Sequence, residues 1–167
     1  MPEEEYVKAV RAYADMVFRI AVNYCKRVQD AEDIVQDVFL KLYQHGRAFA
    51  DEEHLKRWLI RVTVNKSKDL LASSWYKRVG PLEGMAPELS FATPEKGELY
   101  EAVRSLPAKY RAVVHLYYYE DYSVKEIAAI LHRKETTIQT QLMRGREMLR
   151  QRLDNSTTGN GLLNSKI

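Results

Sequence analysis

Cysteine is almost absent from this sequence of 167 residues: Cys25 stands alone, which excludes a disulfide within the chain. Cys25 falls in an apolar helical stripe, which favours a plain buried thiol over a redox or metal role. No apolar run approaches the ~18 residues that cross a membrane as a helix. The first residues, MPEEEYVKAV, lack the basic and then apolar pattern of a secretion signal. We therefore expect a cytoplasmic protein without membrane contact of its own.

Glycine and proline are also scarce, and they are unevenly placed. Residues 80–97, GPLEGMAPELSFATPEKG, hold three of the 7 glycines and three of the 5 prolines, and only Pro2 and Gly46 precede them. Such a cluster is typical of a linker. We predict two small helical domains, at residues 1–79 and 98–154, joined by a flexible linker at 80–97. The polar tail at 155–167 is expected to be disordered.

Strand patterns are missing, whereas apolar residues recur at helical spacing in both predicted domains, so the sequence predicts an all-α fold. A first helix is expected to bury Val7, Val10, Ala14, Val17, Phe18 and Ala21. A second helix is expected to bury Ile34, Val35, Val38, Phe39 and Leu42. Asp30 can cap this second helix, Glu32 and Asp33 suit its first turn, and Gly46 is expected to end it.

Positive charge gathers in two blocks, although the net charge is only +3. Residues 55–82 carry 7 basic and 1 acidic side chains, and residues 122–153 carry 7 and 3, whereas residues 1–54 carry 7 and 11. Two basic patches in acidic surroundings indicate two places that hold a polyanion. Either block alone would fit a solvated helix face equally well.

The first basic block predicts a third helix, from about Glu53 to Ser73. Its inward side is expected to hold Leu55, Trp58, Leu59 and Val62, with Trp58 in the core. Another face groups Arg57, Arg61, Asn65 and Lys68. After the helix, aromatic and basic residues mix at Trp75, Tyr76, Lys77 and Arg78. Basic groups beside aromatic rings suit a nucleic acid whose bases leave the stack, although a charged surface around a core tryptophan is the plain alternative.

The second basic block has the spacing of a helix-turn-helix. Leu106-Pro107 restarts a helix, and Ser123–Glu126 and Thr136–Gln139 read as capping boxes thirteen residues apart. The small pair Ala128–Ala129 would permit a close helix crossing. The inner faces are expected to hold Ile127, Ala128, Ile130, Leu131, Ile138, Leu142, Gly145, Leu149 and Leu153, with Gly145 marking close backbone packing.

The outer face of the last helix carries Gln139, Thr140, Met143 and Arg144, with Gln141 to one side. Gln pairs with adenine, Arg with guanine, and Thr or Met with the thymine methyl group. Basic residues suited to phosphates are Arg133, Lys134, Arg146 and Arg150. The pattern favours DNA binding over an ordinary amphipathic pair of helices.

One face of the second helix is acidic. Asp33, Gln36, Asp37 and Leu40 lie at i, i+3, i+4 and i+7, away from the predicted core. From this spacing alone, a solvated face and a partner site are both open interpretations.

Together these segments resemble the extracytoplasmic-function (ECF) type of bacterial RNA polymerase sigma factor, over about residues 5–153. DAEDIVQDVFLKLY is similar to the helix that grips the polymerase clamp, and RWLIRVTVNKSKDLL to the helix that reads and opens the −10 promoter element. SLPAKYRAVVHLYYYEDYSVKEIAAIL and TTIQTQLMRGREMLRQRL are similar to the domain that reads the −35 element. The resemblance implies a protein that binds core RNA polymerase and promoter DNA and is held inactive by an anti-sigma factor.

The resemblance also assigns roles to residues. Clamp contacts would come from Asp33, Gln36, Asp37 and Leu40. A base flipped from the −10 element would be captured by the loop around Phe49 and by Asn65, beside Arg57, Arg61 and Lys68. The −35 element would face Lys134, Thr137, Gln139, Thr140, Met143, Arg144 and Arg146. Residues 80–97 would thread through the polymerase toward its RNA exit channel.

The sequence departs from the family pattern in places. Gln139 and Gln141 stand where basic residues are common, and Thr63-Val64 where Ala or Arg is common. The −10 loop is acidic at Asp51, Glu52 and Glu53, so its base preference does not carry over.

Two other classes of protein fit the sequence less well. A stand-alone helix-turn-helix regulator would leave the basic helix without a role. An enzyme acting on DNA lacks support, because the first serine is Ser67, inside the basic helix, and the four histidines are scattered without metal-ligand spacing: His45, His54, His115 and His132. We therefore expect no enzymatic activity and no cofactor.

Overall fold

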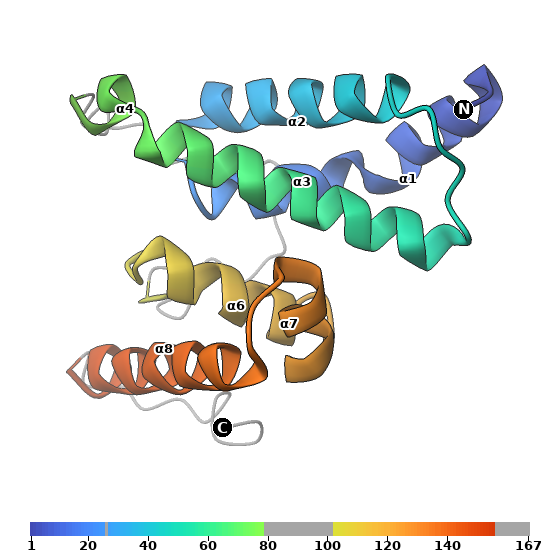
Figure 1. Ribbon diagram of the computed structural model, residues 1–167. Coiled ribbons are helices and arrows are strands. Elements are labelled where there is room, and N and C mark those ends of the chain that lie inside the picture. Colours follow the sequence, from blue (N-terminus) through green and yellow to red (C-terminus); the bar gives the residue numbers. More distant parts are fainter. Residues whose placement is uncertain (26, 79–101, 156–167) are drawn as a thin grey trace. The chain divides into compact units, whose positions relative to one another are not determined.

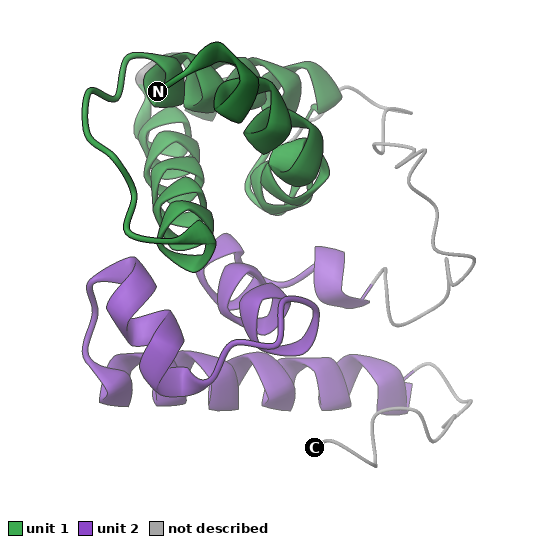
Figure 2. Ribbon diagram, turned by 90° about the vertical axis from the view of Figure 1, so that its right-hand side faces the viewer, with its two compact units in different colours: residues 1–88 green, residues 89–167 purple. Residues whose placement is uncertain are grey.

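Helices make up the regular structure of the described residues, which contain no strand, so the all-α prediction is confirmed. The computed structural model describes residues 1–25, 27–78 and 102–155 (Figure 1). The chain divides into two compact units, Met1–Glu88 and Leu89–Ile167 (Figure 2). The predicted linker at 80–97 and nearly all of the predicted tail lie outside the described residues, so the predicted domain limits stay predictions.

The first unit is a bundle of three long helices: α1 (Glu3–Val22), α2 (Val28–Tyr43) and α3 (Glu52–Ala72). Each of the three packs against the other two, and the short α4 (Ser74–Arg78) follows α3 (Figure 1). The predicted limits of the third helix are therefore correct to within one residue. Fully buried core side chains include Val17, Val38, Leu42, Leu59, Ile60 and Val64. Each large aliphatic side chain buried in this way contributes about 1.5–3 kcal/mol.

The predicted buried face of α1 is only partly right. Val17 and Ala21 are buried as expected, but Val7 is 39% exposed, and Val10, Ala14 and Phe18 are half-buried. The residues that α1 buries instead are Ala9, Met16, Ile20 and Val22. Because α1 packs against both α2 and α3, its C-terminal half buries a wider face than one stripe of helical spacing describes.

Asp30 does not cap α2. The helix begins earlier, with Arg27 at the N-cap position, so Asp30 lies in the first turn, and Glu32 and Asp33 lie beyond it. The buried carboxylate of Asp30 accepts two hydrogen bonds from Arg27, at 3.0 Å from Nε and 3.1 Å from Nη2. This bidentate pair takes the carboxylate away from the capping geometry.

The end of α2 also differs from the prediction. The helix ends at Tyr43 with Gln44 as its C-cap, so Gly46 lies beyond it and does not end it. Cys25, just before α2, is a buried thiol, as predicted.

The second unit contains α6 (Ala108–Tyr118), α7 (Val124–Leu131) and α8 (Glu135–Asn155). Ser123 and Glu126 form the predicted capping box at the start of α7. The second predicted capping box is wrong, because α8 begins at Glu135 and Thr136 is already inside the helix. His132, the C-cap residue of α7, takes a left-handed conformation with φ of 51°, as is common where a helix ends.

The crossing between α6 and α8 depends on Gly145. A Cβ atom at this position would lie 3.1 Å from Cγ2 of Val114 and 3.5 Å from Cβ of Tyr110. The predicted close packing at Gly145 is therefore confirmed. The other small residues behave differently, because Ala128 is buried but Ala129 is exposed and takes no part in a crossing.

We expect Gly145→Ile to destabilise the second unit by about 2 kcal/mol, because an overpacked helix contact displaces its neighbours. Both tryptophans, Trp58 and Trp75, lie in the first unit, so tryptophan fluorescence reports on that unit alone. Urea unfolding followed by far-ultraviolet circular dichroism should show an earlier transition, while the fluorescence transition stays in place. Gly145→Ala is the smaller control. An unchanged dichroism curve for Gly145→Ile would contradict the packing argument.

Candidate nucleic-acid interface

The outer face of α8 is exposed along the helix-turn-helix. Gln139, Thr140, Met143 and Arg144 are all exposed, as predicted, and Met143 reaches 58% exposure. Inward, Ile138, Leu142 and Leu149 are buried with Gly145. The buried side therefore fixes which side chains α8 presents to solvent. These side chains offer hydrogen-bond donors and acceptors to base edges, and the thioether of Met143 can contact a thymine methyl group.

Arg144, although exposed, lies beside Tyr110 of α6. A hydrogen bond from Arg144 lowers the pKa of the Tyr110 hydroxyl, and the charge of Lys109 acts in the same direction. The Lys109 ammonium also lies 4.9 Å from the centre of the Tyr110 ring. Tyr110, on α6, is therefore within reach of the guanidinium that was predicted to read a base.

Arg146 is held against α6. Its Nε donates a 2.8 Å hydrogen bond to the Tyr118 hydroxyl, and the guanidinium carbon lies 5.3 Å from the centre of the Tyr117 ring. Arg146 is half-buried, so it lies beside the exposed face and not within it. In the turn, Arg133 donates to the amide oxygen of Gln141 at 3.3 Å, whereas Lys134 and Thr137 are exposed.

On the predicted −10 face of α3, Asn65 is exposed, and Arg57, Arg61 and Lys68 are partly exposed. Arg57 pairs with Glu53 at 2.8 Å. The sequence thus places a neutral amide among cations on one side of a helix whose opposite side is the core of the unit.

The aromatic residues near this helix do not all lie where the sequence suggested. Trp58 is half-buried and not in the core, because it packs under the loop between α2 and α3. Tyr76 is fully buried, whereas Trp75 is 55% exposed. The guanidinium carbon of Arg27 lies 5.0 Å from the centre of the Trp75 ring, so α4 is tied to the start of α2. Tyr76 is therefore a core residue and cannot stack on a base.

Phe49, in the loop between α2 and α3, belongs to an aromatic cluster with His45, His54 and Trp58. Its ring stacks on His45 at 4.9 Å and meets Trp58 at 5.5 Å and His54 at 5.4 Å, edge to face. Phe49 was predicted from the sequence, but the two histidines were not, because the four histidines appear scattered along the chain. The feature of the sequence that could have indicated the cluster is that His45 and His54 lie at the two ends of one short loop.

The acidic stripe of α2 is exposed at all four predicted positions: Asp33, Gln36, Asp37 and Leu40. Leu40 is 53% exposed, and Tyr43, one turn further along α2, is 63% exposed. Asp37 pairs with Lys66 of α3 at 3.0 Å. The stripe is therefore a mixed acidic and apolar surface that ends in an aromatic residue the sequence analysis did not include.

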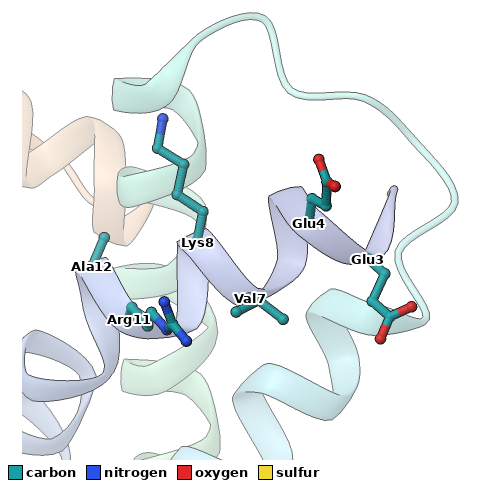
Figure 3. Close-up of a pocket in the computed structure, with 6 residues that line it drawn as sticks. All are labelled: Glu3, Glu4, Val7, Lys8, Arg11 and Ala12. Carbon is teal, nitrogen blue, oxygen red and sulfur yellow. The ribbon is translucent and has the colours of Figure 1, made fainter.

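The hollow found on the surface of the first unit does not coincide with the predicted sites. A shallow hollow runs along α1, lined by Glu3, Glu4, Val7, Lys8, Arg11 and Ala12 (Figure 3). Its charges are mixed in sign, and it contains none of the predicted site residues.

Within the described ranges, no three His, Cys, Asp or Glu side chains are grouped as metal ligands. None of the helices described is long and apolar enough to span a membrane.

Family models match both units. Residues 9–76 match the model of sigma-70 region 2, and residues 96–149 match that of sigma-70 region 4. The chain is 26% identical to the ECF RNA polymerase sigma factor SigW of Bacillus subtilis, over 90% of each protein. It is 32% identical to the ECF sigma factor SigE of Mycolicibacterium smegmatis, over 84% of this chain and 58% of that protein.

Solved structures show the same fold. The sigma factor RpoE of Bartonella quintana, in complex with the anti-sigma factor NepR, matches with a TM-score of 0.67 and 19% identity, over 90% of this chain and 98% of that chain. CnrH, in complex with the cytosolic domain of CnrY, matches with a TM-score of 0.64 and 21% identity, over 92% of this chain and 90% of that chain. With both regions present in their usual order, the chain belongs to the ECF family of sigma factors, which direct RNA polymerase to promoters.

Proposed function

We propose that the two units divide promoter recognition, so that residues 1–79 bind the polymerase clamp and open the −10 element while residues 98–154 read the −35 element. The observation that carries this proposal is the presence of three exposed surfaces on helices whose other sides are buried. These are the stripe of α2, the Asn65 face of α3 and the outer face of α8. Residues 80–97 would connect the two DNA contacts through the polymerase.

Promoter opening would depend on the first unit. Flipping a base out of a duplex costs a few kcal/mol of lost stacking and pairing. The exposed amide of Asn65 can donate to and accept from a base edge. Phe49 offers an aromatic ring nearby in sequence, and Arg57, Arg61 and Lys68 are placed to neutralise phosphates. No covalent step is needed, so we propose that the protein has no enzymatic activity.

The −35 contacts would centre on Arg144, beside Tyr110, with Gln139, Thr140 and Met143 around it. Gln141 is half-buried and bonded by Arg133, so we do not place it at a base. Lys134, Thr137 and Arg146 would contact phosphates or sugars, with Arg146 braced by Tyr118. The two glutamines in place of basic residues leave fewer phosphate contacts, so binding to the −35 element should depend less steeply on salt than in more basic relatives.

Polymerase would bind the stripe of α2, where the carboxylates can pair with basic groups and Leu40 adds apolar contact. We further propose that an anti-sigma factor holds the protein inactive and that both partners meet it in the cytoplasm. Support for the inhibitor comes from the fold shared with the sigma factor RpoE, which was solved in complex with the anti-sigma factor NepR.

Purified core polymerase should start transcription from new sites in a promoter library only when this protein is present. Those sites should share two upstream elements. If no such site appears while the protein alone shifts intact duplex DNA, the alternative of a stand-alone helix-turn-helix regulator is correct, and the roles of Asp33, Gln36 and Asn65 are lost with the proposal.

Arg144→Ala should relax base preference in the upstream element and lower transcription about tenfold, because a bidentate arginine–guanine pair is worth about 1–3 kcal/mol. Asn65→Ala should instead relax preference in the downstream element. The measurement is library transcription with sequence counts at each position. Lys134→Ala is the matched control, since loss of a phosphate contact weakens all promoters alike. Equal changes at both elements in both variants would contradict the division of labour.

Asp33→Lys should weaken binding to core polymerase about tenfold or more, because it reverses a charge on the proposed clamp surface. Asp15→Lys makes the same charge change on the exposed side of α1 and should leave binding within about twofold, as expected for an isolated surface charge. Competition against a labelled sigma factor for core polymerase measures both. Equal affinities for the two variants would remove the stripe of α2 from the interface.

A further inference from the structure

The loop between α2 and α3 is held by His54. The backbone N–H of Ala50 donates a hydrogen bond to Nδ1 of His54 at 3.2 Å. In return, Oδ1 of Asp51, the N-cap residue of α3, accepts a 2.7 Å hydrogen bond from the backbone N–H of His54. The two bonds bracket the turn at Ala50 and Asp51 from both sides. They resemble a capping box in which the third helical residue reaches one position further back.

The side chain of His54 also touches the ring that this loop presents. Phe49 directly precedes Ala50, so fixing the Ala50 amide fixes the backbone on which the Phe49 ring is carried. The imidazole meets the Phe49 ring at 5.4 Å and 80°, while His45 stacks on the same ring at 23°. Trp58, one helical turn after His54, meets both Phe49 and His45. One residue therefore sets both the turn and one side of the aromatic cluster.

Apart from these two hydrogen bonds and the ring contacts of Phe49, the loop is mostly exposed. Residues 46–48 and 50–51 are exposed, and a Cβ atom added at Gly46 would find no atom within 4 Å. Exposed segments with little buried area open at low free energy. In contrast, the start of α3 is anchored, because the Tyr13 hydroxyl of α1 donates to Glu52 at 3.1 Å. Burial, and then this hydrogen bond, raises the pKa of Tyr13 to about 12. His54 thus transmits the position of an anchored helix to a loop with few contacts of its own.

An imidazole that accepts at Nδ1 carries its proton on Nε2. The loop needs a hydrogen-bond acceptor at the position of Nδ1, and another side chain that places an acceptor there can replace His54. An asparagine side chain places its amide oxygen at about the position of Nδ1, whereas leucine retains bulk beside Phe49 but has no acceptor.

We propose that His54 is a positioning residue for promoter opening: its Nδ1 holds the Ala50 turn so that Phe49 is already in place when a base of the −10 element leaves the stack. This inference rests on the proposed function of the loop in base capture. A loop that is already ordered loses no further entropy when the base is flipped. The free-energy cost of opening the duplex is therefore lower.

The experiment uses holoenzyme with the full-length chain and two templates of one promoter, an intact duplex and the same sequence with a mismatched, already open −10 region. We expect His54→Leu to lower transcription about fivefold on the duplex, the factor that corresponds to one net hydrogen bond of about 1 kcal/mol. On the open template its activity should stay within about twofold of the unmodified protein. His54→Asn, which keeps an acceptor, should recover most of the loss on the duplex.

A second measurement needs no polymerase. Hydrogen exchange of the Ala50 amide in the free protein should speed up in His54→Leu and stay slow in His54→Asn, with far-ultraviolet circular dichroism confirming that both variants are folded.

Several outcomes overturn the proposal. These are unchanged duplex transcription in His54→Leu, equal loss on both templates, the same loss in His54→Asn, or unchanged Ala50 exchange. Failure of the unmodified protein to start transcription at all would instead refute the proposed function, while the exchange measurement would still test the role of His54 in the loop.

Discussion

The buried side of α3 fixes the position of its exposed side. Leu59, Ile60 and Val64 pack into the bundle of the first unit, so a helix that must present Asn65 to solvent has no freedom to rotate. A rotation of one residue position, about 100°, would bury the amide and expose the core. The surface proposed for DNA is therefore specified by apolar contacts on the opposite side of the same helix. Those contacts contribute far more free energy than any single polar contact on the surface.

The second unit applies the same constraint through a smaller residue. Gly145 lies against Val114 and Tyr110, which draws α8 close to α6. Its neighbours in the chain, Arg144 and Arg146, are then close enough for the tyrosines of α6 to bind them. The close helix crossing thus brings both cations beside tyrosines of α6, and the hydrogen bond to Tyr118 sets the direction of Arg146. Reduced side-chain freedom before binding lowers the entropy lost when DNA binds.

In the free protein, an ion pair joins the surface proposed for polymerase to the helix proposed for DNA. Asp37, on the stripe proposed for polymerase, is paired with Lys66, on the helix proposed for DNA. Exposed pairs of this kind are worth about 0–1 kcal/mol, so a polymerase cation can replace Lys66 at little cost. The buried pair of Arg27 and Asp30 is different, because its loss would leave a charge without compensation inside the fold. It ties the start of α2 to α4 through Trp75.

The linear sequence determined the features that depend on spacing and composition. Helical periodicity placed α3 and the inner face of α8, glycine at position 145 indicated the close crossing, and the exposed residues of α8 followed from the buried ones. Family motifs then identified the sigma-factor regions. These features are local or periodic, so they can be read without knowing which helices meet.

Tertiary structure decided what depends on contacts between distant residues. Asp30 does not cap α2 because its carboxylate is bound by Arg27, and Tyr76 is buried in the core although Lys77 and Arg78 follow it directly. His54 looked isolated in the sequence because its partner is the backbone N–H of Ala50, and a backbone donor leaves no side-chain signature. Helical periodicity specifies only the face of the helix on which a side chain lies. Its direction from there is set by the residues that pack against it in the tertiary structure.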